Sequence, residues 1–222
     1  MKLGILFSGG KDSCYAAYIS KKEGYEIGCL ITVASENKES YMFHTPSIKM
    51  VKKQAEVMGL PLIFFNTKGE KDKELLDLKK AIEEGIKKYN IKGVVSGAVE
   101  SVYQSSNIQK ICNELNMDCF NPLWKKNQYE LLGEIIKNKF FVIITGVFAY
   151  PLNKNWLGRK IDEKFLQDIK ELNEKYKINI SGEGGEYESF VLNCGLFKRK
   201  LRIIGFKDYG EKNSWRRELL VK

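Results

Sequence analysis

The stretch that decides the fold is KLGILFSGGKDS, residues 2–13. Residues 2–7 form a short apolar run typical of a buried strand, and residues 12–22 are compatible with a helix. The loop between them contains two adjacent glycines, which allow a tight turn that brings backbone amides close to an anion. A helix that starts at this point adds the positive end of its dipole. The stretch therefore predicts a phosphate-binding loop between a strand and a helix.

Each position of this loop has a role in that prediction. The serine hydroxyls can donate hydrogen bonds, and Lys11 supplies a compact positive charge. Asp12 is unusual for a bare anion site and is explained either as an aid to a bound Mg²⁺ or by loop geometry. The spacing matches neither a Walker A loop nor a dinucleotide-binding G-x-G-x-x-G. The residues expected to hold phosphates are Ser8, Gly9, Gly10, Lys11, Asp12 and Ser13, with Asp12 also the candidate metal ligand.

Apolar and helical segments alternate over the first 120 residues. Strands are expected at 2–7, 25–33, 62–65, 93–96 and 119–120, and helices at 12–22, 46–58, 72–89 and 101–116. This order predicts an α/β fold, a Rossmann-like parallel sheet with helices on both faces. After residue 122 the pattern changes to two helices (128–138 and 162–175), a strand (140–145) and glycine-separated strands. We therefore expect a nucleotide-binding domain at 1–122 and a smaller α+β domain at 123–222.

Three polar clusters follow expected strands, at residues 8–13, 34–45 and 97–104. Ligands of parallel sheets bind at the carboxyl ends of the strands, so these clusters should lie together. The second contains the only histidine of the chain, His44, a candidate proton acceptor or phosphate contact. In the third, Ser101 is a plausible helix cap, and Tyr103 and Gln104 are candidates to face the nucleotide or the acceptor.

The segment GEGGEYES, residues 182–189, places glycines beside three carboxylates. Glycines cost backbone entropy that a generic turn would not need. If residues 186–190 are extended, Glu186 and Glu188 point to one face and Tyr187 to the other. With Glu183, these carboxylates could hold a cationic acceptor, ammonium or Mg²⁺; an acidic hairpin turn is the alternative.

The chain has 222 residues and a net charge of +9, with nine basic against three acidic side chains in residues 198–222. A basic end indicates an acidic or RNA-containing partner, or simply a solvated surface. No apolar run is long enough to span a membrane, and the first residues do not resemble a secretory signal, so a cytoplasmic protein is expected.

Together, SGGKDS at 8–13, SYMFHT at 40–45 and GEGGEYES at 182–189 resemble the diphthine–ammonia ligase family, a branch of the N-type PP-loop ATP pyrophosphatases. The PLW at 122–124 and the LG at 157–158 are similar to family landmarks in the same order. The resemblance covers residues 1 to roughly 195.

The resemblance implies that ATP adenylates the diphthine carboxylate of translation elongation factor 2, that ammonia then amidates it, and that AMP and pyrophosphate leave. Residues 8–13 would bind the phosphates, with Lys11 and Asp12 at the reacting end. His44 and the three glutamates would line the acceptor or ammonia side, with Glu186 in a catalytic role. An aromatic face such as that of Tyr187 is a natural host for the quaternary ammonium of the acceptor.

One segment departs from the family: Ser105-Ser106-Asn107 follows Tyr103-Gln104 where relatives carry a basic stretch. No segment is free for a glutaminase, so free ammonium is the expected donor. The alternatives are a tRNA-modifying PP-loop enzyme, disfavoured by the lack of a C-x-x-C pair, and a nucleotide-binding regulator without chemistry. RNA contact is allowed but not favoured, and a homo-oligomer is allowed. We interpret the basic end as a docking surface for the protein substrate, so that neutralising Arg216 and Arg217 should weaken turnover but not ATP binding.

Overall fold

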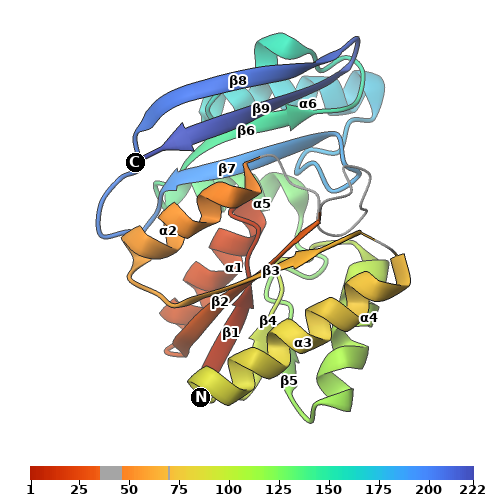
Figure 1. The fold of residues 1–222 in the computed structure, drawn as a ribbon. Coiled ribbons are helices and arrows are strands. Elements are labelled where there is room, and N and C mark those ends of the chain that lie inside the picture. Colours follow the sequence, from red (N-terminus) through yellow and green to blue (C-terminus); the bar gives the residue numbers. More distant parts are fainter. Residues whose placement is uncertain (36–46, 70) are drawn as a thin grey trace.

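The computed structural model describes residues 1–35, 47–69 and 71–222. The first part of the chain forms a parallel sheet of five strands in the order β3-β2-β1-β4-β5 (Figure 1). The strands are β1 (Lys2–Leu6), β2 (Glu26–Ser35), β3 (Leu62–Thr67), β4 (Gly93–Val95) and β5 (Asp118–Phe120). The reversal of strand order beside β1 creates the crevice in which ligands of this architecture bind.

Helices cover both faces of this sheet. They are α1 (Lys11–Lys22), α2 (Val51–Met58), α3 (Lys71–Tyr89) and α4 (Val102–Glu114). Buried side chains of α1 and α2 pack with Leu3, Ile5 and Leu30 on one face, whereas those of α3 and α4 pack with Ile31 and Val33 on the other. The predicted α/β class with helices on both faces is confirmed.

The helix expected at 46–58 begins later in the structure. A short 3₁₀ turn, η1 (Ile48–Met50), precedes α2, and the residue before η1, Ser47, has a left-handed backbone with φ of 64°. A regular helix cannot run through such a conformation. The cap proposed at Thr45 lies outside the described residues.

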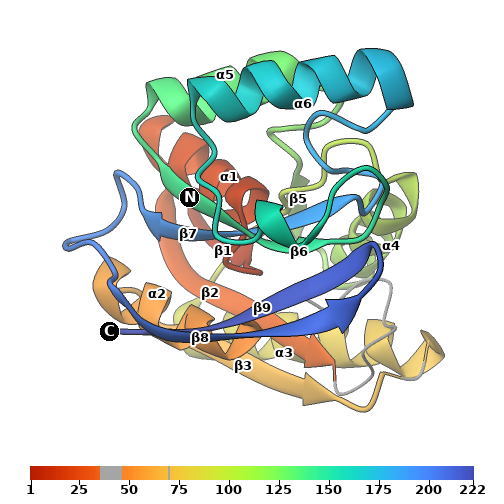
Figure 2. The same ribbon diagram turned by 90° about the horizontal axis from the view of Figure 1, so that it is seen from above.

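The second part of the chain forms an antiparallel sheet in the order β7-β6-β9-β8. Its strands are β6 (Phe141–Val147), β7 (Tyr187–Asn193), β8 (Ile203–Glu211) and β9 (Ser214–Val221). Helices α5 (Gln128–Lys137) and α6 (Glu163–Tyr176) lie side by side, and a 3₁₀ turn, η2 (Lys154–Trp156), follows β6 (Figure 2). This is the α+β arrangement expected after residue 122.

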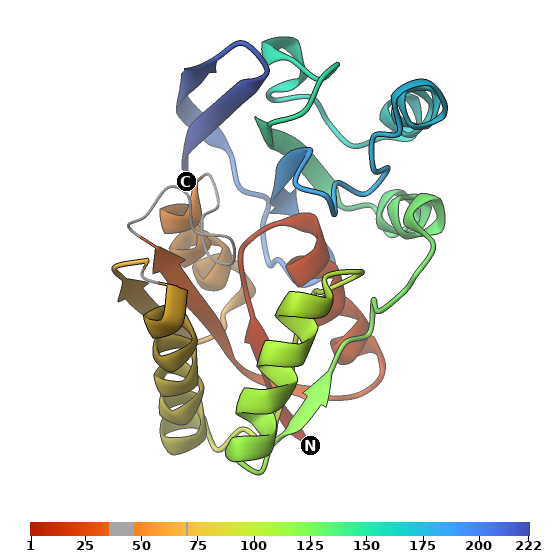
Figure 3. The ribbon, with the colours of Figure 1, turned by 90° about the vertical axis from the view of Figure 1, so that its right-hand side faces the viewer.

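The two sheets lie one above the other and share buried side chains (Figure 3). The largest buried cluster joins Leu3 and Ile5 of β1 to Leu131 of α5 and Val142 of β6. A separate cluster joins Val57 of α2 to side chains of the second sheet. A common core of this kind holds the two sheets in a fixed relation. The division at residue 122 stays a prediction.

The basic end of the chain forms the hairpin of β8 and β9, and β8 is the edge strand. Arg217 does not project from it as a free charge: its guanidinium donates to both carboxylate oxygens of Asp208, at 2.7 and 2.9 Å. Arg216 lines an internal cavity instead. Neither arginine is therefore a free charge on the outer face of the hairpin, and the interpretation of the basic end as a docking surface stays a prediction. No helix in the described part of the chain is long and apolar enough to cross a membrane.

Candidate active site

A cavity of about 560 Å³ lies between the two sheets, where β1, β2 and β4 end and β7 and β9 begin. Its lining includes the phosphate loop and part of the glycine-rich segment 182–189. One wall is apolar and comes from β2, α3 and α4: Ile31, Val33, Leu78 and Ile108. The cavity therefore combines polar groups suited to phosphates with an apolar wall suited to an aromatic base.

The phosphate loop has its turn at Gly9, whose φ is 79°. A side chain here would lie 2.3 Å from the side-chain oxygen of Gln54, so glycine is required by space as well as by conformation. Gln54 is fully buried and donates from Nε2 to the carbonyls of Gly9 and Val191, at 2.9 and 2.8 Å. Val191 in turn donates its amide to Gly9. The edge of β7 and one residue of α2 thus fix the turn.

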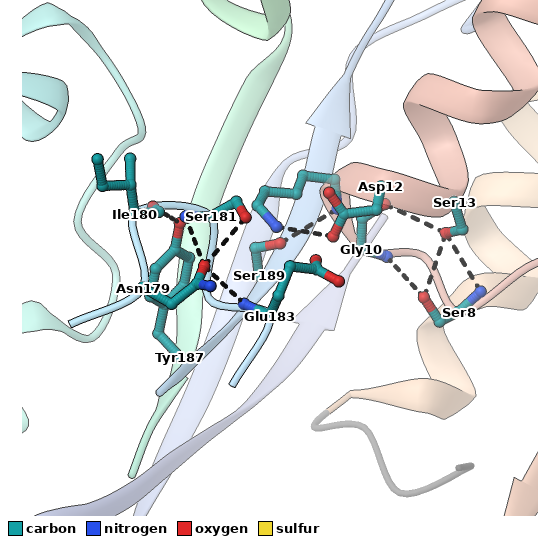
Figure 4. A network of polar contacts seen from close by, with 11 residues as sticks. Ser8, Gly10, Asp12, Ser13, Asn179, Ile180, Ser181, Glu183, Tyr187 and Ser189 are labelled. Atoms are coloured by element: carbon teal, nitrogen blue, oxygen red, sulfur yellow. Dashed lines mark hydrogen bonds and ion pairs between the residues drawn. The ribbon is translucent and has the colours of Figure 1, made fainter. Parts of the chain in front are cut away.

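Backbone amides at the start of α1 are open to a ligand. Within the described residues, the amides of Asp12 and Ser13 have no hydrogen-bond partner, as expected for the first turn of a helix. Ser13 Oγ lies 3.2 Å from Ser8 Oγ and the same distance from the Gly10 carbonyl (Figure 4). The loop therefore presents amides and hydroxyls at one helix N-terminus, a geometry that favours an anion.

Gly97 lets β4 approach this loop. A side chain at this position would lie 2.8 Å from the backbone carbon of Asp12 and the backbone nitrogen of Ser13. In the third cluster, Ser101 caps α4 by accepting from the amide of Gln104, as proposed. Gln104 lines the cavity and Tyr103 does not. His44 lies outside the described residues.

Lys11 is buried although it carries a charge. Its side chain is 4% exposed, and Nζ lies 2.7 Å from Asp12 Oδ2. The ammonium also lies 5.6 Å from the ring centroid of Tyr187, a cation–π distance. An ordered, partly desolvated ammonium at the phosphate loop is suited to stabilise negative charge that develops there.

Asp12 and Glu183 form a pair of carboxyl groups across the cavity. Figure 4 shows Glu183 reaching from the glycine-rich segment toward the phosphate loop. Burial and the negative charge of Asp12 together raise the pKa of Glu183 to about 7, although the positive charge of Lys11 opposes the rise. Asp12 Oδ1 is buried without a hydrogen-bond partner in the described part of the chain. An orphaned carboxylate oxygen beside a second carboxyl group fits a Mg²⁺ site.

The glycine-rich segment is shaped by a residue that precedes it. Asn179 Oδ1 accepts from the amide of Ser181, from its hydroxyl and from the amide of Glu183, at 3.0 to 3.1 Å. Gly182 has a φ of 77°, and a side chain there would lie 3.0 Å from the Tyr187 ring. These contacts turn the segment so that Glu183 faces the cavity.

The structure differs from the expected geometry of this segment at Glu186. Glu186 does not line the cavity, because β7 begins only at Tyr187 and the Glu186 carboxylate accepts from the amide of Asn179 at 3.0 Å. Tyr187 lines the cavity, but it is 4% exposed, packs edge-on against Phe165 and donates its hydroxyl to the Ile180 carbonyl, so its role as an aromatic host stays a prediction. Glu183 and Glu188 are the carboxyl groups at the cavity.

Glu188 is half-buried, but its Oε2 atom is fully enclosed. Burial raises its pKa to about 8, the nearby Arg216 guanidinium opposes the rise, and Glu218 adds to it. Arg216 also lines the cavity, and its guanidinium carbon lies 4.9 Å from the Phe148 ring centroid.

The similarity of this chain to known proteins covers the residues of both sheets. The profile described as "Diphthamide synthase N-terminal domain" matches residues 1–119, and that of the "Diphthamide synthase C-terminal domain" matches residues 127–218. The chain belongs to the diphthamide synthase family. It is 34% identical to the diphthine–ammonia ligase of Rattus norvegicus and 33% identical to that of Homo sapiens, over 91% of this chain and 83% of each relative.

A solved structure titled as a predicted subunit of tRNA methyltransferase from Methanocaldococcus jannaschii is also similar, with 21% identity and a TM-score of 0.47. It covers 88% of this chain and 98% of that one. Membership of the diphthamide synthase family confirms the resemblance found in the sequence, and it makes the chain an enzyme of the ligase class. The alternatives of a tRNA-modifying enzyme and of a regulator without chemistry are not supported, because both parts of the chain match the one family.

Sequence reasoning gave no role to four residues of this diphthamide synthase site, Gln54, Phe148, Asn179 and Ser189, and it placed Arg216 on a docking surface and not in the cavity. Asn179 carried a weak signal, since asparagine before a glycine turn often bonds to the backbone two residues on. The others depend on which elements pack together, and no local pattern reports that.

Proposed function

We propose that this diphthamide synthase family member adenylates the diphthine carboxylate of translation elongation factor 2 with ATP and amidates it with free ammonia, releasing AMP and pyrophosphate. The observation that carries the proposal is one cavity that joins an anion-binding loop to two buried carboxyl groups of the glycine-rich segment. The carboxylate to be activated and the phosphates that activate it then meet in one place. We place the reaction in the cytoplasm, with its protein substrate.

The phosphate loop binds the pyrophosphate part of ATP. During adenylation the acceptor carboxylate attacks the α-phosphorus, and pyrophosphate leaves with growing negative charge. The open amides of Asp12 and Ser13 and the ammonium of Lys11 are already oriented toward that charge. Groups that need no reorganisation stabilise the transition state more than the ground state.

Asp12 would hold Mg²⁺ through the oxygen that lacks a protein partner, with Glu183 on the other side of the cavity. When bound, the ion neutralises phosphate charge during the transfer. The apolar wall of Ile31, Val33 and Ile108 receives the adenine ring, where a flat apolar surface is buried without loss of hydrogen bonds.

Glu183 also serves the second half of the reaction. Ammonia that attacks an acyl adenylate becomes an ammonium group in the tetrahedral intermediate, and this group must lose a proton. A carboxylate with a pKa of about 7 is a suitable acceptor at neutral pH. The surrounding cavity walls keep water from competing with ammonia for the activated acyl group.

The proposed roles keep the division at residue 122. Residues 1–122 supply the nucleotide loop and the apolar wall, and residues 123–222 supply the carboxyl groups that face it. Gln104 lies on the nucleotide side of the cavity, and His44 stays a candidate on the acceptor side.

The test is amidation itself. The purified protein is incubated with ATP, Mg²⁺, an ammonium salt and diphthine-bearing elongation factor 2, and the factor is then measured by mass spectrometry. We expect the mass change that corresponds to replacing a hydroxyl by an amino group, and no change with K11M. A protein that works with glutamine but not with ammonium would contradict the proposed nitrogen source.

A further inference from the structure

Glu188 and Arg216 face each other across a residue without a side chain. Gly146 of β6 pairs with Glu188 of β7 on one side and with Arg216 of β9 on the other. Directly paired residues of neighbouring strands project to the same face of a sheet. Because adjacent strands are about 4.8 Å apart, the two backbones are separated by roughly 10 Å. The acidic and the basic side chain therefore flank the space above Gly146, which no side chain of residue 146 fills.

Phe148 closes this space from above. A side chain at position 146 would lie 2.6 Å from the Phe148 ring and 3.4 Å from Glu188 Cβ, so only glycine fits. The Arg216 guanidinium lies against the same ring, 4.9 Å from its centroid. Stacking on an aromatic ring limits how a guanidinium can rotate and leaves its edge free to bind a planar anion.

Glu188 and Arg216 are half-buried, and each has one buried polar atom that lacks a partner. Glu188 Oε2 and Arg216 Nε each have no hydrogen-bond partner within the described ranges, and no ion pair joins the two side chains there. A buried polar atom without a partner costs free energy, of the order of 1–3 kcal/mol and more for a charged group. An acidic and a basic group with such atoms on one wall of a cavity indicate a ligand that carries both charges, because the cation of such a ligand favours the ionised form of Glu188.

The acceptor in the proposed function is such a ligand. Diphthine carries a quaternary ammonium and a carboxylate on the same carbon atom. A quaternary ammonium has no proton to donate and is bound by negative charge and aromatic surface. A carboxylate is bound best by a guanidinium, through two parallel hydrogen bonds.

We propose that Arg216 binds the carboxylate of the acceptor, that Glu188 binds its quaternary ammonium, and that Phe148 orients Arg216 for this contact. The inference rests on the proposed function and assigns the residues that select a zwitterionic acceptor. It gives a basic residue of the C-terminal hairpin a place inside the site. It also explains why β6 carries glycine at position 146, next to the last residue of a largely apolar strand.

The test compares R216Q and E188Q with K207Q. Lys207 is exposed in the same hairpin and does not line the cavity, so its variant removes one positive charge without touching the site. The measurements are the KM for diphthine-bearing elongation factor 2 at saturating ATP, and the Kd for ATP without acceptor. We expect R216Q and E188Q each to raise the acceptor KM about tenfold or more, because R216Q loses a charged hydrogen bond and E188Q loses the charge attraction to the quaternary ammonium. The Kd for ATP should stay within about twofold of the wild type.

The R216K variant distinguishes loss of the acceptor contact from misfolding, because lysine keeps the positive charge but cannot form the two parallel hydrogen bonds. Its acceptor KM should lie between those of the wild type and R216Q. An unchanged acceptor KM in R216Q would overturn the inference, as would a rise in the Kd for ATP of the same size, since Arg216 would then bind phosphate. If the wild type itself forms no amide, the proposed function fails. If the wild type forms the amide and R216Q has the same acceptor KM, the proposed function stands and only this inference fails.

Discussion

The backbone amide of Lys11 donates a hydrogen bond to the side-chain oxygen of Ser189, at 3.1 Å and across 178 positions of the sequence. Lys11 opens the first helix after the phosphate loop, and Ser189 lies on β7, directly after Glu188. This bond joins the two halves of the site. A shift of the glycine-rich segment would move the phosphate loop, so the geometry for the nucleotide and that for the acceptor depend on each other.

We expect S189A to weaken both substrates. Loss of one buried hydrogen bond costs about 1 kcal/mol, which corresponds to about a fivefold rise in the Kd for ATP. Because β7 also carries Glu188, the acceptor KM should rise as well. Isothermal titration and steady-state kinetics measure these effects, with the exposed S106A as the control. A change in ATP binding alone would show that the two halves are not connected through this bond.

Gln54 should matter as much to stability as to binding. Its two donated hydrogen bonds hold the carbonyls of Gly9 and Val191. Q54L keeps the size but removes both donors, so the free energy of unfolding should fall by about 2 kcal/mol. The Kd for ATP should rise because the turn at Gly9 loses its support. Denaturant unfolding gives the first value, and Q109L, on the exposed face of α4, is the matched control. Equal stability of Q54L and the wild type would contradict this account.

Glu183 should control the pH dependence of amidation. With a pKa of about 7 its carboxylate gains charge as the pH rises through neutrality, so kcat should rise over the same range. E183Q should lower kcat by about 100-fold and remove this rise, since an amide accepts no proton. The rates are compared at a fixed concentration of unprotonated ammonia. A variant that keeps the wild-type pH profile would exclude Glu183 as the proton acceptor.

Substitution of Glu186, unlike that of Glu183, should have little effect on the reaction. Its carboxylate accepts from the amide of Asn179 and lies away from the cavity. E186Q keeps an oxygen that can accept this bond, so we expect an acceptor KM and a kcat within about twofold of the wild type, the effect of a nearly neutral exchange. Kinetics on the same factor preparation check this expectation. A large rise in acceptor KM would restore the role that the sequence alone predicted for Glu186.

Glu188 should also make folding stability depend on pH. Its pKa is about 8 in the folded protein, against 4.5 for an ordinary glutamate in water, so the folded state holds the proton more tightly than the unfolded chain does. The free energy of unfolding therefore falls as the pH rises from about 4.5 to about 8, by several kcal/mol. Glu183 contributes in the same direction.

In E188Q the part of this fall that is due to Glu188 should disappear. The variant should be more stable than the wild type at about pH 8.5 and similar at about pH 4.5. Denaturant unfolding at several pH values measures the difference, with the exposed E171Q as the control. If the free energy of unfolding changes with pH in the same way in E188Q and in the wild type, the pKa of Glu188 is not raised in the folded protein.

The sequence predicted the phosphate loop well because the loop is local. The strand, the glycines and the helix start lie within residues 2–13, and each acts on its immediate neighbours. The glycine-rich segment was harder. The predicted alternation of side chains between the two faces of a strand starts at Glu186, but β7 begins only at Tyr187. The turn that Asn179 stabilises directs Glu183 to the cavity.

Arg216 was assigned to a surface because the sequence shows only another basic residue in a basic hairpin. Its position inside the cavity follows from the pairing of β9 with β6, which is a long-range contact. Gln54 likewise acts through β7, far from it in sequence. Short-range periodicity indicates which face of an element is buried, but not which element covers that face.

The identity of the nucleotide product tests the central claim most directly. The wild type is incubated with ATP, isotopically labelled ammonium and diphthine-bearing elongation factor 2, and both the nucleotides and the factor are analysed. The account predicts one AMP and one pyrophosphate for each labelled nitrogen that enters the factor, because the loop at Ser8–Ser13 holds the leaving pyrophosphate. Formation of ADP and phosphate, or incorporation of nitrogen without cleavage of ATP, would contradict it.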